Sequence, residues 1–194
     1  MTIQTRRERE RAERERLIVT AARDLAEAEG WDAVTTRRLA AEIEYSQPVL
    51  YSHFKGKDAI MAAVAVQGCA ELAVELRAAR TAAGDPRGAL AAIGEAYTAF
   101  ARRRPALYDA IFTHHVDLPF ATPEAPAALQ EAFGELAQAV EPVAADGDDP
   151  GLLTETYWAA LHGLVTLMRS GRLPERAHEA RLELLIGHFT AGVV

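Results

Sequence analysis

The stretch Ser46–Ile60, "SQPVLYSHFKGKDAI", holds a helix start, a helix end and a set of polar side chains in a short space. Ser46 is a good N-cap, and Pro48 falls in the first turn, where its missing N–H costs nothing. Leu50 and Phe54 lie one turn apart and predict a single buried face. The stretch therefore predicts a short helix that ends at "KGK" and leaves its polar residues exposed.

Two further helices are expected before this stretch. Residues 6–29 carry charges of both signs at i,i+4 spacing, then an apolar stripe, and Gly30 is a candidate C-cap. Thr35 or Thr36 can cap a short helix whose inner face is Leu39, Ala40 and Ile43. Two short helices joined by a few residues are typical of a helix-turn-helix. The charge run that opens the chain is either a solvated helix face or an arm that contacts nucleic acid.

Helical periodicity continues to the end of the chain. Proline, glycine and polar breaks at 84–86, 105, 116–124 and 146–151 separate helices expected near 58–81, 86–104, 105–115, 125–145, 151–170 and 175–190. No strand-like alternation of useful length occurs. We expect an all-α fold of about nine helices, with a DNA-binding domain over residues 1–58, a helix linking from about residue 57, and a second helical domain over 59–194.

Composition excludes several classes of protein. The chain has 194 residues, of which 49% are hydrophobic and 25% charged, as in ordinary globular domains. We expect no membrane span, since no run of 18 apolar residues occurs, and no signal peptide. The single cysteine, Cys69, provides neither a disulfide nor a cysteine-based metal site, so a buried cysteine in a cytoplasmic protein is expected.

The charge distribution separates the two expected domains. The net charge is −7, but residues 1–58 hold eleven basic and eleven acidic residues. The whole acidic excess therefore lies in residues 59–194, and the first third can still present a basic face.

A helix-turn-helix places the start of its second helix in the major groove. Gln47, Tyr51, Ser52 and His53 could then reach base edges or phosphates. Lys57, at the start of the long helix, could meet a phosphate where the helix dipole also favours an anion.

The residues "GWDAVTTRRLAAEIEYSQPVLYSHFKGKDAI" resemble the DNA-binding segment of tetracycline-repressor (TetR) type regulators. About fifty residues match, and "QPVLYSHFKGK" is especially close to the tetracycline repressors themselves. By position, the resemblance implies that Thr36 bonds a phosphate and that Arg37 reaches a base, with guanine plausible because arginine can bond its O6 and N7 together. The DNA-binding residues that we expect are Thr35, Thr36, Arg37, Ser46, Gln47, Pro48, Val49, Tyr51, Ser52, His53 and Lys57.

Two of these side chains have a structural alternative, and one turn position departs from the family. His53 could instead pack or cap, and Tyr51 could be a partly buried support. Glu44 stands where the family commonly has glycine. If Glu44 adopts a left-handed conformation, that costs roughly 1 kcal/mol, and its carboxylate lies unfavourably near phosphates.

The second domain carries a further resemblance. "WAALHGLVTL" resembles the Trp…His-Gly signature of one C-terminal class of the family, with Trp158, His162 and Gly163 in place. The family implies a small-molecule effector pocket, partly apolar, and a homodimer built on the last two helices. The pocket residues that we expect are Tyr97, Phe100, Tyr108, Phe112, Phe120, Trp158 and His162. The dimer residues that we expect are Leu153, Tyr157, Leu161, Leu164, Met168, Leu182, Leu185 and Phe189. Both sets could also be ordinary core.

The expected function is a ligand-responsive regulator, most simply a repressor, that binds a palindromic operator in double-stranded DNA as a homodimer. We expect no enzyme, cofactor or metal site, since the sequence lacks a glycine-rich phosphate loop, a metal-ligand set and a nucleophile–base pattern. The alternative is an all-α small-molecule carrier or enzyme without sequence-specific DNA binding. A third possibility, a DNA-compacting protein, conflicts with the acidic second domain.

Overall fold

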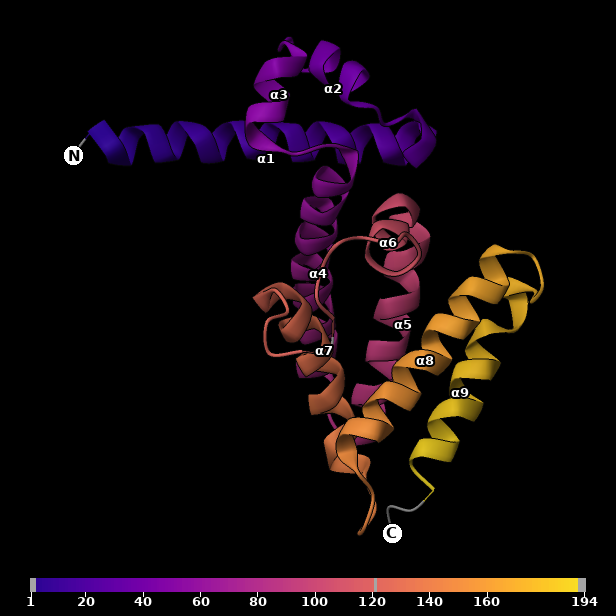
Figure 1. The fold of residues 1–194 in the computed structure, drawn as a ribbon. Helices are drawn as coiled ribbons and strands as arrows, with labels where there is room; N and C mark the ends of the chain where they lie inside the picture. The colour runs from indigo at the N-terminus through magenta and orange to yellow at the C-terminus, as the bar shows by residue number, and fades with distance from the viewer. Residues whose placement is uncertain (1–2, 121, 192–194) are drawn as a thin grey trace. The chain divides into compact units, whose positions relative to one another are not determined.

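The computed structural model describes residues 3–120 and 122–191, and these residues form helices but no strand. This confirms the all-α prediction. The α-helices are α1 (Ile3–Glu29), α2 (Thr36–Glu42), α3 (Gln47–His53), α4 (Lys57–Ala82), α5 (Pro86–Arg103), α6 (Pro105–Phe112), α7 (Ala127–Val140), α8 (Pro150–Arg169) and α9 (His178–Phe189) (Figure 1). Three short 3-10 helices are η1 (Trp31–Ala33), η2 (Glu141–Val143) and η3 (Glu175–Ala177).

The described residues divide into two compact units. Unit 1 contains the described residues up to Gly68 together with Arg104–Pro126, and unit 2 contains Cys69–Arg103 and the described residues from Ala127 onward. The first part of α4 therefore belongs to unit 1 and the rest to unit 2. Unit 1 is larger than the expected DNA-binding domain because α6 and the loop after it pack with the N-terminal helices.

In unit 1, only the C-terminal half of α1 has buried side chains among those described. Ile18, Ala22 and Leu25 are buried, whereas the side chains described before Ile18 are exposed or half-buried. The helix ends at Glu29 because Gly30 adopts φ 83°, and the Gly30 amide donates to the Ala26 carbonyl at 2.8 Å. The C-cap expected at Gly30 is thus present.

The turn between α2 and α3 contains the departure noted at Glu44. Thr35 caps α2, since its hydroxyl accepts a hydrogen bond from the Arg38 amide at 3.2 Å. At the other end, Tyr45 N–H donates to Ala40 O at 2.8 Å and Glu44 N–H donates to Ala41 O at 3.3 Å, which is the Schellman pattern. Glu44 is left-handed, with φ 57°. The usual glycine position therefore keeps its glycine-like backbone although a glutamate occupies it.

Three side-chain contacts join α6 to the N-terminal helices of unit 1. The Glu27 carboxylate accepts hydrogen bonds from the amides of Ala106 at 3.1 Å and Leu107 at 3.0 Å, so a residue of α1 caps the first turn of α6. The buried Trp31 indole N–H donates to the Ala106 carbonyl at 2.8 Å. Gly68 lets α4 approach α6 closely, because a Cβ there would lie 2.8 Å from Leu107.

In unit 2, α5 lies at the centre and contacts α7, α8 and α9. The Tyr157 hydroxyl of α8 donates to the Leu90 carbonyl of α5 at 2.7 Å inside the core, and burial raises the pKa of Tyr157 above its usual value. Gly94 allows this approach, since a Cβ there would lie 2.9 Å from the Tyr157 hydroxyl. The core of unit 2 is therefore closed around one buried tyrosine bond.

Helix α4 has the length and composition of a membrane span without the exposure of one. Its most apolar 18-residue window has a mean hydropathy of 1.6, yet 50% of that window is buried inside the protein. Core helices of non-membrane proteins pass the same test of length and composition. The window is therefore weak evidence for a membrane span.

Candidate nucleic-acid interface

Helix α3 exposes five side chains and turns two, those of Leu50 and His53, inward. Leu50 is completely buried, which fixes the helix on unit 1. The exposed residues of the helix are Gln47, Pro48, Val49, Tyr51 and Ser52. Ser52 does not aim freely, because its hydroxyl donates to the Val49 carbonyl at 2.6 Å. The exposed residues of α3 thus offer an amide, an apolar side chain and two hydroxyl groups.

The start of α2 lies next to this surface. The Thr36 hydroxyl lies 3.3 Å from the Tyr51 hydroxyl of α3, and either oxygen can be the donor. Arg37 follows Thr36 and is exposed, whereas Arg38 turns back to pair with Glu29. Thr35 is occupied in capping α2. The structure therefore brings Thr36, Arg37 and Tyr51 together at the junction of α2 and α3.

Of three other expected contact residues, two have side-chain partners within unit 1. Ser46 occupies the N-cap position of α3 but makes no capping bond with its side chain. The His53 ring is only 5% exposed, and its Nδ1 lies 3.4 Å from a carboxylate oxygen of Glu15. The ammonium of Lys57 donates to the carbonyl of Trp31. His53 and Lys57 thus tie α3 and α4 to the rest of the unit, and Lys57 keeps two further N–H groups for a phosphate.

A groove runs between α1 and α2 beside the turn. It holds about 510 Å³, and Leu17, Leu25 and Ile43 contribute to its apolar floor. Glu44 belongs to its lining together with Asp24, Glu29, Glu42 and the paired Arg38. The carboxylate that departs from the family pattern therefore belongs to a mostly acidic rim.

The seven expected pocket residues fall in both units. Tyr97 and Phe100 of α5 are buried in unit 2, and Tyr108 of α6 is buried in unit 1 beside the half-buried Phe112, with ring centroids 4.9 Å apart. Phe120 is 42% exposed. The seven therefore do not line one site inside a single unit.

Part of this set does gather in unit 2. The Trp158 indole donates to the Tyr97 hydroxyl at 3.1 Å, and the His162 ring lies 6.4 Å from the Trp158 ring. Burial lowers the pKa of His162 below its usual value, which favours a neutral imidazole. Tyr97, Trp158 and His162 thus form a chain of aromatic side chains that carry polar groups.

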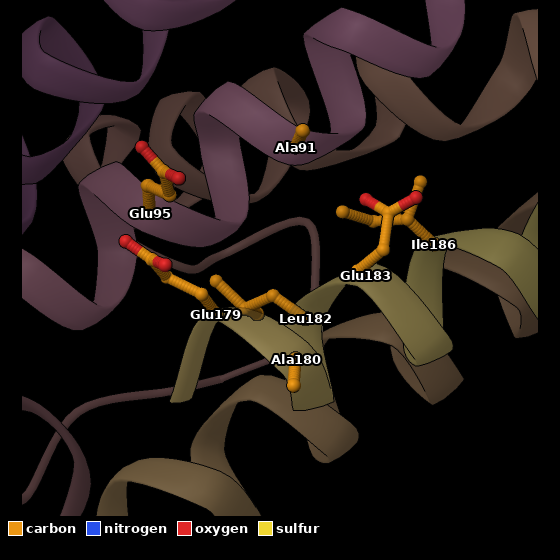
Figure 2. A pocket seen from close by; sticks show the side chains of 7 residues that line it. All are labelled: Ala91, Glu95, Glu179, Ala180, Leu182, Glu183 and Ile186. Carbon is orange, nitrogen blue, oxygen red and sulfur yellow. The ribbon is translucent and has the colours of Figure 1, made fainter. Parts of the chain in front are cut away.

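Another groove of unit 2 lies between α5 and α9 and was not expected from the sequence. It holds about 310 Å³, with Ala91, Leu182 and Ile186 in its lining. The carboxylates of Glu95 and Glu179 lie at one end and that of Glu183 lies at the other (Figure 2). Arg87 pairs with Glu183 and donates to the Thr190 hydroxyl at 2.8 Å. A periodic pattern in each helix could not reveal this groove, because its two walls, residues 91–95 and 179–186, lie far apart in sequence.

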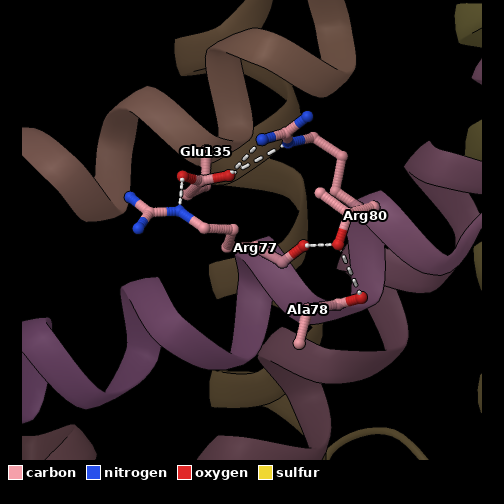
Figure 3. Close-up of polar contacts among 5 residues, drawn as sticks. Arg77, Ala78, Arg80 and Glu135 are labelled. Atoms are coloured by element: carbon pink, nitrogen blue, oxygen red, sulfur yellow. Dashed lines mark hydrogen bonds and ion pairs between the residues drawn. The ribbon is translucent and has the colours of Figure 1, made fainter.

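A buried carboxylate connects the end of α4 to α7. Glu135 is 2% exposed and accepts hydrogen bonds from Arg77 at 2.7 Å and from Arg80 at 2.7 and 3.0 Å (Figure 3). Burial alone would raise the pKa of Glu135, but the two guanidinium groups outweigh it and hold the pKa below its usual value. The pairing keeps the far end of α4 attached to the body of unit 2.

The expected dimer residues divide by depth. Tyr157, Leu161 and Leu182 are buried in the core of unit 2, while Leu153, Leu164, Met168, Leu185 and Phe189 are half-buried. The most exposed large apolar side chains on the last two helices are instead Leu152, Leu167 and Leu184. Each of these leucines is the sequence neighbour of an expected dimer residue and therefore lies about 100° further around its helix. The periodicity of the sequence selected the side of each helix that packs on the core.

Protein-family models match both parts of the chain. The model described as "Bacterial regulatory proteins, tetR family" matches residues 18–64, which span α2 and α3. The model described as "Tetracyclin repressor-like, C-terminal domain" matches residues 90–189, just over half of the chain. Neither description mentions the Trp…His-Gly class, so that assignment stays a prediction.

Two curated relatives and one solved structure agree with these matches. An uncharacterized HTH-type transcriptional regulator of Mycobacterium tuberculosis is 28% identical over 91% of this chain and 79% of its own length. The class A tetracycline repressor of Escherichia coli is 43% identical over 54 residues, 28% of this chain and 25% of that protein. A Rhodococcus protein of unknown function matches in fold, with a TM-score of 0.76 and 22% identity over 92% of this chain and 94% of that one. Together with the exposed α2–α3 surface, the two family matches lead to one conclusion: the chain belongs to the tetR family of bacterial transcriptional regulators, which bind DNA and respond to ligands.

Proposed function

We propose that the protein is a homodimeric repressor that binds a palindromic operator and leaves it when a small molecule binds unit 2. It would act in the cytoplasm, where its DNA lies, and it would perform no catalysis. The observation that carries the proposal is the surface of α2 and α3, which exposes Arg37, Gln47 and Val49 while Leu50 holds α3 in place. Side chains of these types suit base edges, a thymine methyl and phosphates.

A homodimer is supported by the outer faces of α8 and α9. Leu152 and Leu184 are 62% and 65% exposed, and together with the exposed Leu167 they place large apolar side chains on the outside of both last helices, where a partner would cover them in a dimer. A Cβ at Gly163 of α8 or at Gly187 of α9 would meet nothing within 4 Å. Gly163 lies between Leu152 and Leu167 in sequence, and a small residue there allows two helices to approach closely. A second copy would then place a second α3 on the other half of a palindrome.

An effector site in unit 2 is supported by the Tyr97–Trp158–His162 chain. Its groups combine flat apolar rings with a hydroxyl, an indole N–H and an imidazole, as ligand sites commonly do. A ligand can release DNA only if it binds the DNA-free arrangement more tightly than the DNA-bound one. The proposed effector is therefore partly apolar, with a polar group that reaches this chain.

Fluorescence anisotropy tests the proposal directly. The purified protein is titrated onto a labelled duplex from the region upstream of its own gene and onto a scrambled duplex, at two salt concentrations. Tight binding to the first duplex that survives the higher salt supports a specific regulator, and light scattering should give twice the mass of 21.0 kDa. Equal, weak and salt-sensitive binding to both duplexes, or a monomer at micromolar concentration, would contradict it.

A further inference from the structure

The N-terminal half of α1 is helical although none of its described side chains is buried. Helix α1 begins at Ile3, and its first buried side chain among those described is that of Ile18. The fifteen residues from Ile3 to Leu17 span roughly 22 Å of helix. This half of the helix runs past α3 on the N-terminal side (Figure 1). Ion pairs from Arg6 to Glu10 and from Arg11 to Glu15 support it from within.

The net charge of this half is positive, which is unfavourable at the N-terminal end of a helix. Residues 1–16 hold six arginines and four glutamates, while the rest of the chain is acidic. No acidic residue lies in the first turn of α1, although the positive end of the helix dipole favours one there. Arginines near a helix N-terminus weaken the isolated helix, so helix stability does not explain them. An anion outside the chain would explain them, because the dipole and the arginines both attract it.

The six arginines of this half divide into two sets of three by the face on which they lie. At 100° per residue, Arg7, Arg11 and Arg14 lie within about 40° of Ile18, the first buried residue of the helix. The other three arginines, Arg6, Arg9 and Arg16, lie about 120° or more away from it by the same rule. The first three therefore continue the buried stripe of α1 outward, on the side where α2 and α3 pack.

One contact places this part of α1 next to the C-terminal end of α3, the helix that carries most of the candidate DNA surface. Glu15, one turn after Arg11, lies 3.4 Å from His53 at the end of α3. Arg11 already neutralises Glu15, at 2.9 Å. Arg7 and Arg14 are exposed and belong to neither the Arg6–Glu10 nor the Arg11–Glu15 pair, although both help to lower the pKa of Glu10, after its hydrogen bond from Arg6.

We propose that Arg7, Arg11 and Arg14 form a second DNA-contacting element that binds backbone phosphates just outside the half-site read by α3. The proposal rests on the proposed function, since α3 must lie on DNA for the arginines to meet flanking phosphates. Contacts of this kind add affinity without sequence preference. They also lengthen the DNA that one subunit covers.

The experiment compares two triple variants that remove equal charge. The test variant is Arg7→Gln, Arg11→Gln and Arg14→Gln, and the control is Arg6→Gln, Arg9→Gln and Arg16→Gln. Each set removes three positive charges and one i,i+4 ion pair, and glutamine keeps a good helix propensity. Binding is measured by anisotropy across a salt series on two probes: a long duplex from upstream of the gene, and the same site trimmed at its flanks.

On the long duplex, the test variant should reduce the slope of log K against log salt by about 2 to 3, and the control by less than about 1, because each phosphate contact contributes roughly 0.9. On the trimmed duplex the two variants should differ little. Equal losses in both variants, or no loss in either, would overturn the proposal and leave the segment as a solvated helix. Wild-type protein that binds neither probe would overturn the proposed function as well, which separates the two failures.

Crosslinking reports where a residue lies relative to the DNA and does not depend on a difference in affinity. Cys69 is buried and burial raises its pKa to about 12, so a thiol-reactive photocrosslinker will label a newly introduced cysteine instead. Labelled Arg7→Cys should crosslink to the flanks of the long duplex, and labelled Arg9→Cys, on the other face, should not. Equal crosslinking from both positions would overturn the assignment of the face.

Discussion

The Arg37 side chain can contact either a base edge, which gives sequence preference, or a phosphate, which does not. It is exposed at the start of α2, next to the Thr36–Tyr51 pair. We expect Arg37→Ala to weaken operator binding by about 1–3 kcal/mol and to relax the preference at one base pair. Anisotropy on a set of single-base operator variants measures this. A uniform loss on all sequences would make Arg37 a phosphate contact.

Glu44 combines backbone strain with an unfavourable charge, and two substitutions separate these effects. Its φ of 57° suits glycine, so Glu44→Gly should raise the free energy of unfolding by about 1 kcal/mol. Glu44→Gln keeps the strain and removes the charge, so it should leave stability nearly unchanged. Both variants should bind DNA more tightly at low salt. Chemical denaturation and anisotropy on the same samples check the pair, and equal stabilities would rule out strain at this turn.

The sequence predicted the exposed residues of the DNA surface better than the partners of its polar side chains. Leu50 as the buried anchor, Thr35 as the cap and Glu44 as the irregular turn all follow from local spacing and turn chemistry. His53 and Lys57 also read as contact residues, but their bonds go to Glu15 and Trp31. These partners are 38 and 26 residues away, a distance that local patterns do not cover.

Among the elements, the helix starts marked by Pro86 and Pro105 were predicted closely, whereas two boundaries next to Pro142 and Pro174 were missed. Helices α5 and α6 begin at Pro86 and Pro105 as expected. Helix α7 was expected to reach 145 but ends at Val140, because Pro142 interrupts it and η2 follows. Similarly, residues 175–177 form η3 before α9 begins. The α5–α9 groove escaped prediction because it depends on how helices pack.

The link between α4 and α7 should depend on Glu135. Glu135→Ala would leave two arginines without their shared buried carboxylate, so we expect a loss of about 2–3 kcal/mol in the free energy of unfolding. Glu131→Ala removes an exposed carboxylate one turn earlier and serves as the control, with a change within about 0.5 kcal/mol. Denaturant titration of both variants measures the difference. Equal losses in the two variants would show that the ion pairs of Glu135 with Arg77 and Arg80 do not hold α4 and α7 together.

The outer face of α8 can be tested at its glycine. A Cβ at Gly163 would meet nothing within 4 Å, and leucine is a better helix former than glycine by about 1 kcal/mol, so we expect Gly163→Leu not to destabilise a monomer. In a dimer that buries this face, the same leucine should shift the protein to monomer. Gly134→Leu on α7 also points into open space and should leave the dimer intact. Light scattering decides, and a dimeric Gly163→Leu variant would place the interface elsewhere.

For the molecule as a whole, the free energy of unfolding should decrease in two steps as the pH is lowered from neutral. Burial lowers the folded-state pKa of His162 and His178, so the unfolded chain binds protons more readily and stability declines as the pH falls below about 6.5. Arginines 102 and 181 add to the shift at His178. Glu135, whose folded pKa is also lowered, contributes stability at neutral pH that is lost below about pH 4.5. Melting temperatures measured from pH 8 down to about pH 2 cover both steps. His162→Gln with His178→Gln should flatten the first step, and His115→Gln, at an exposed position, should not.

The bonds from Glu27 and Trp31 to the start of α6 bear on how regulators of this kind can be recombined. A chimaera that joins residues 1–68 to another ligand-binding domain would lack residues 106 and 107. The indole N–H of Trp31 would then lose its acceptor, the carbonyl of Ala106. The carboxylate of Glu27 would lose its donors, the amides of Ala106 and Leu107. The chimaera would also lack the leucine that packs against Gly68. The transferable module is therefore discontinuous in sequence, and a working graft has to carry residues 104–126 together with the reading helices.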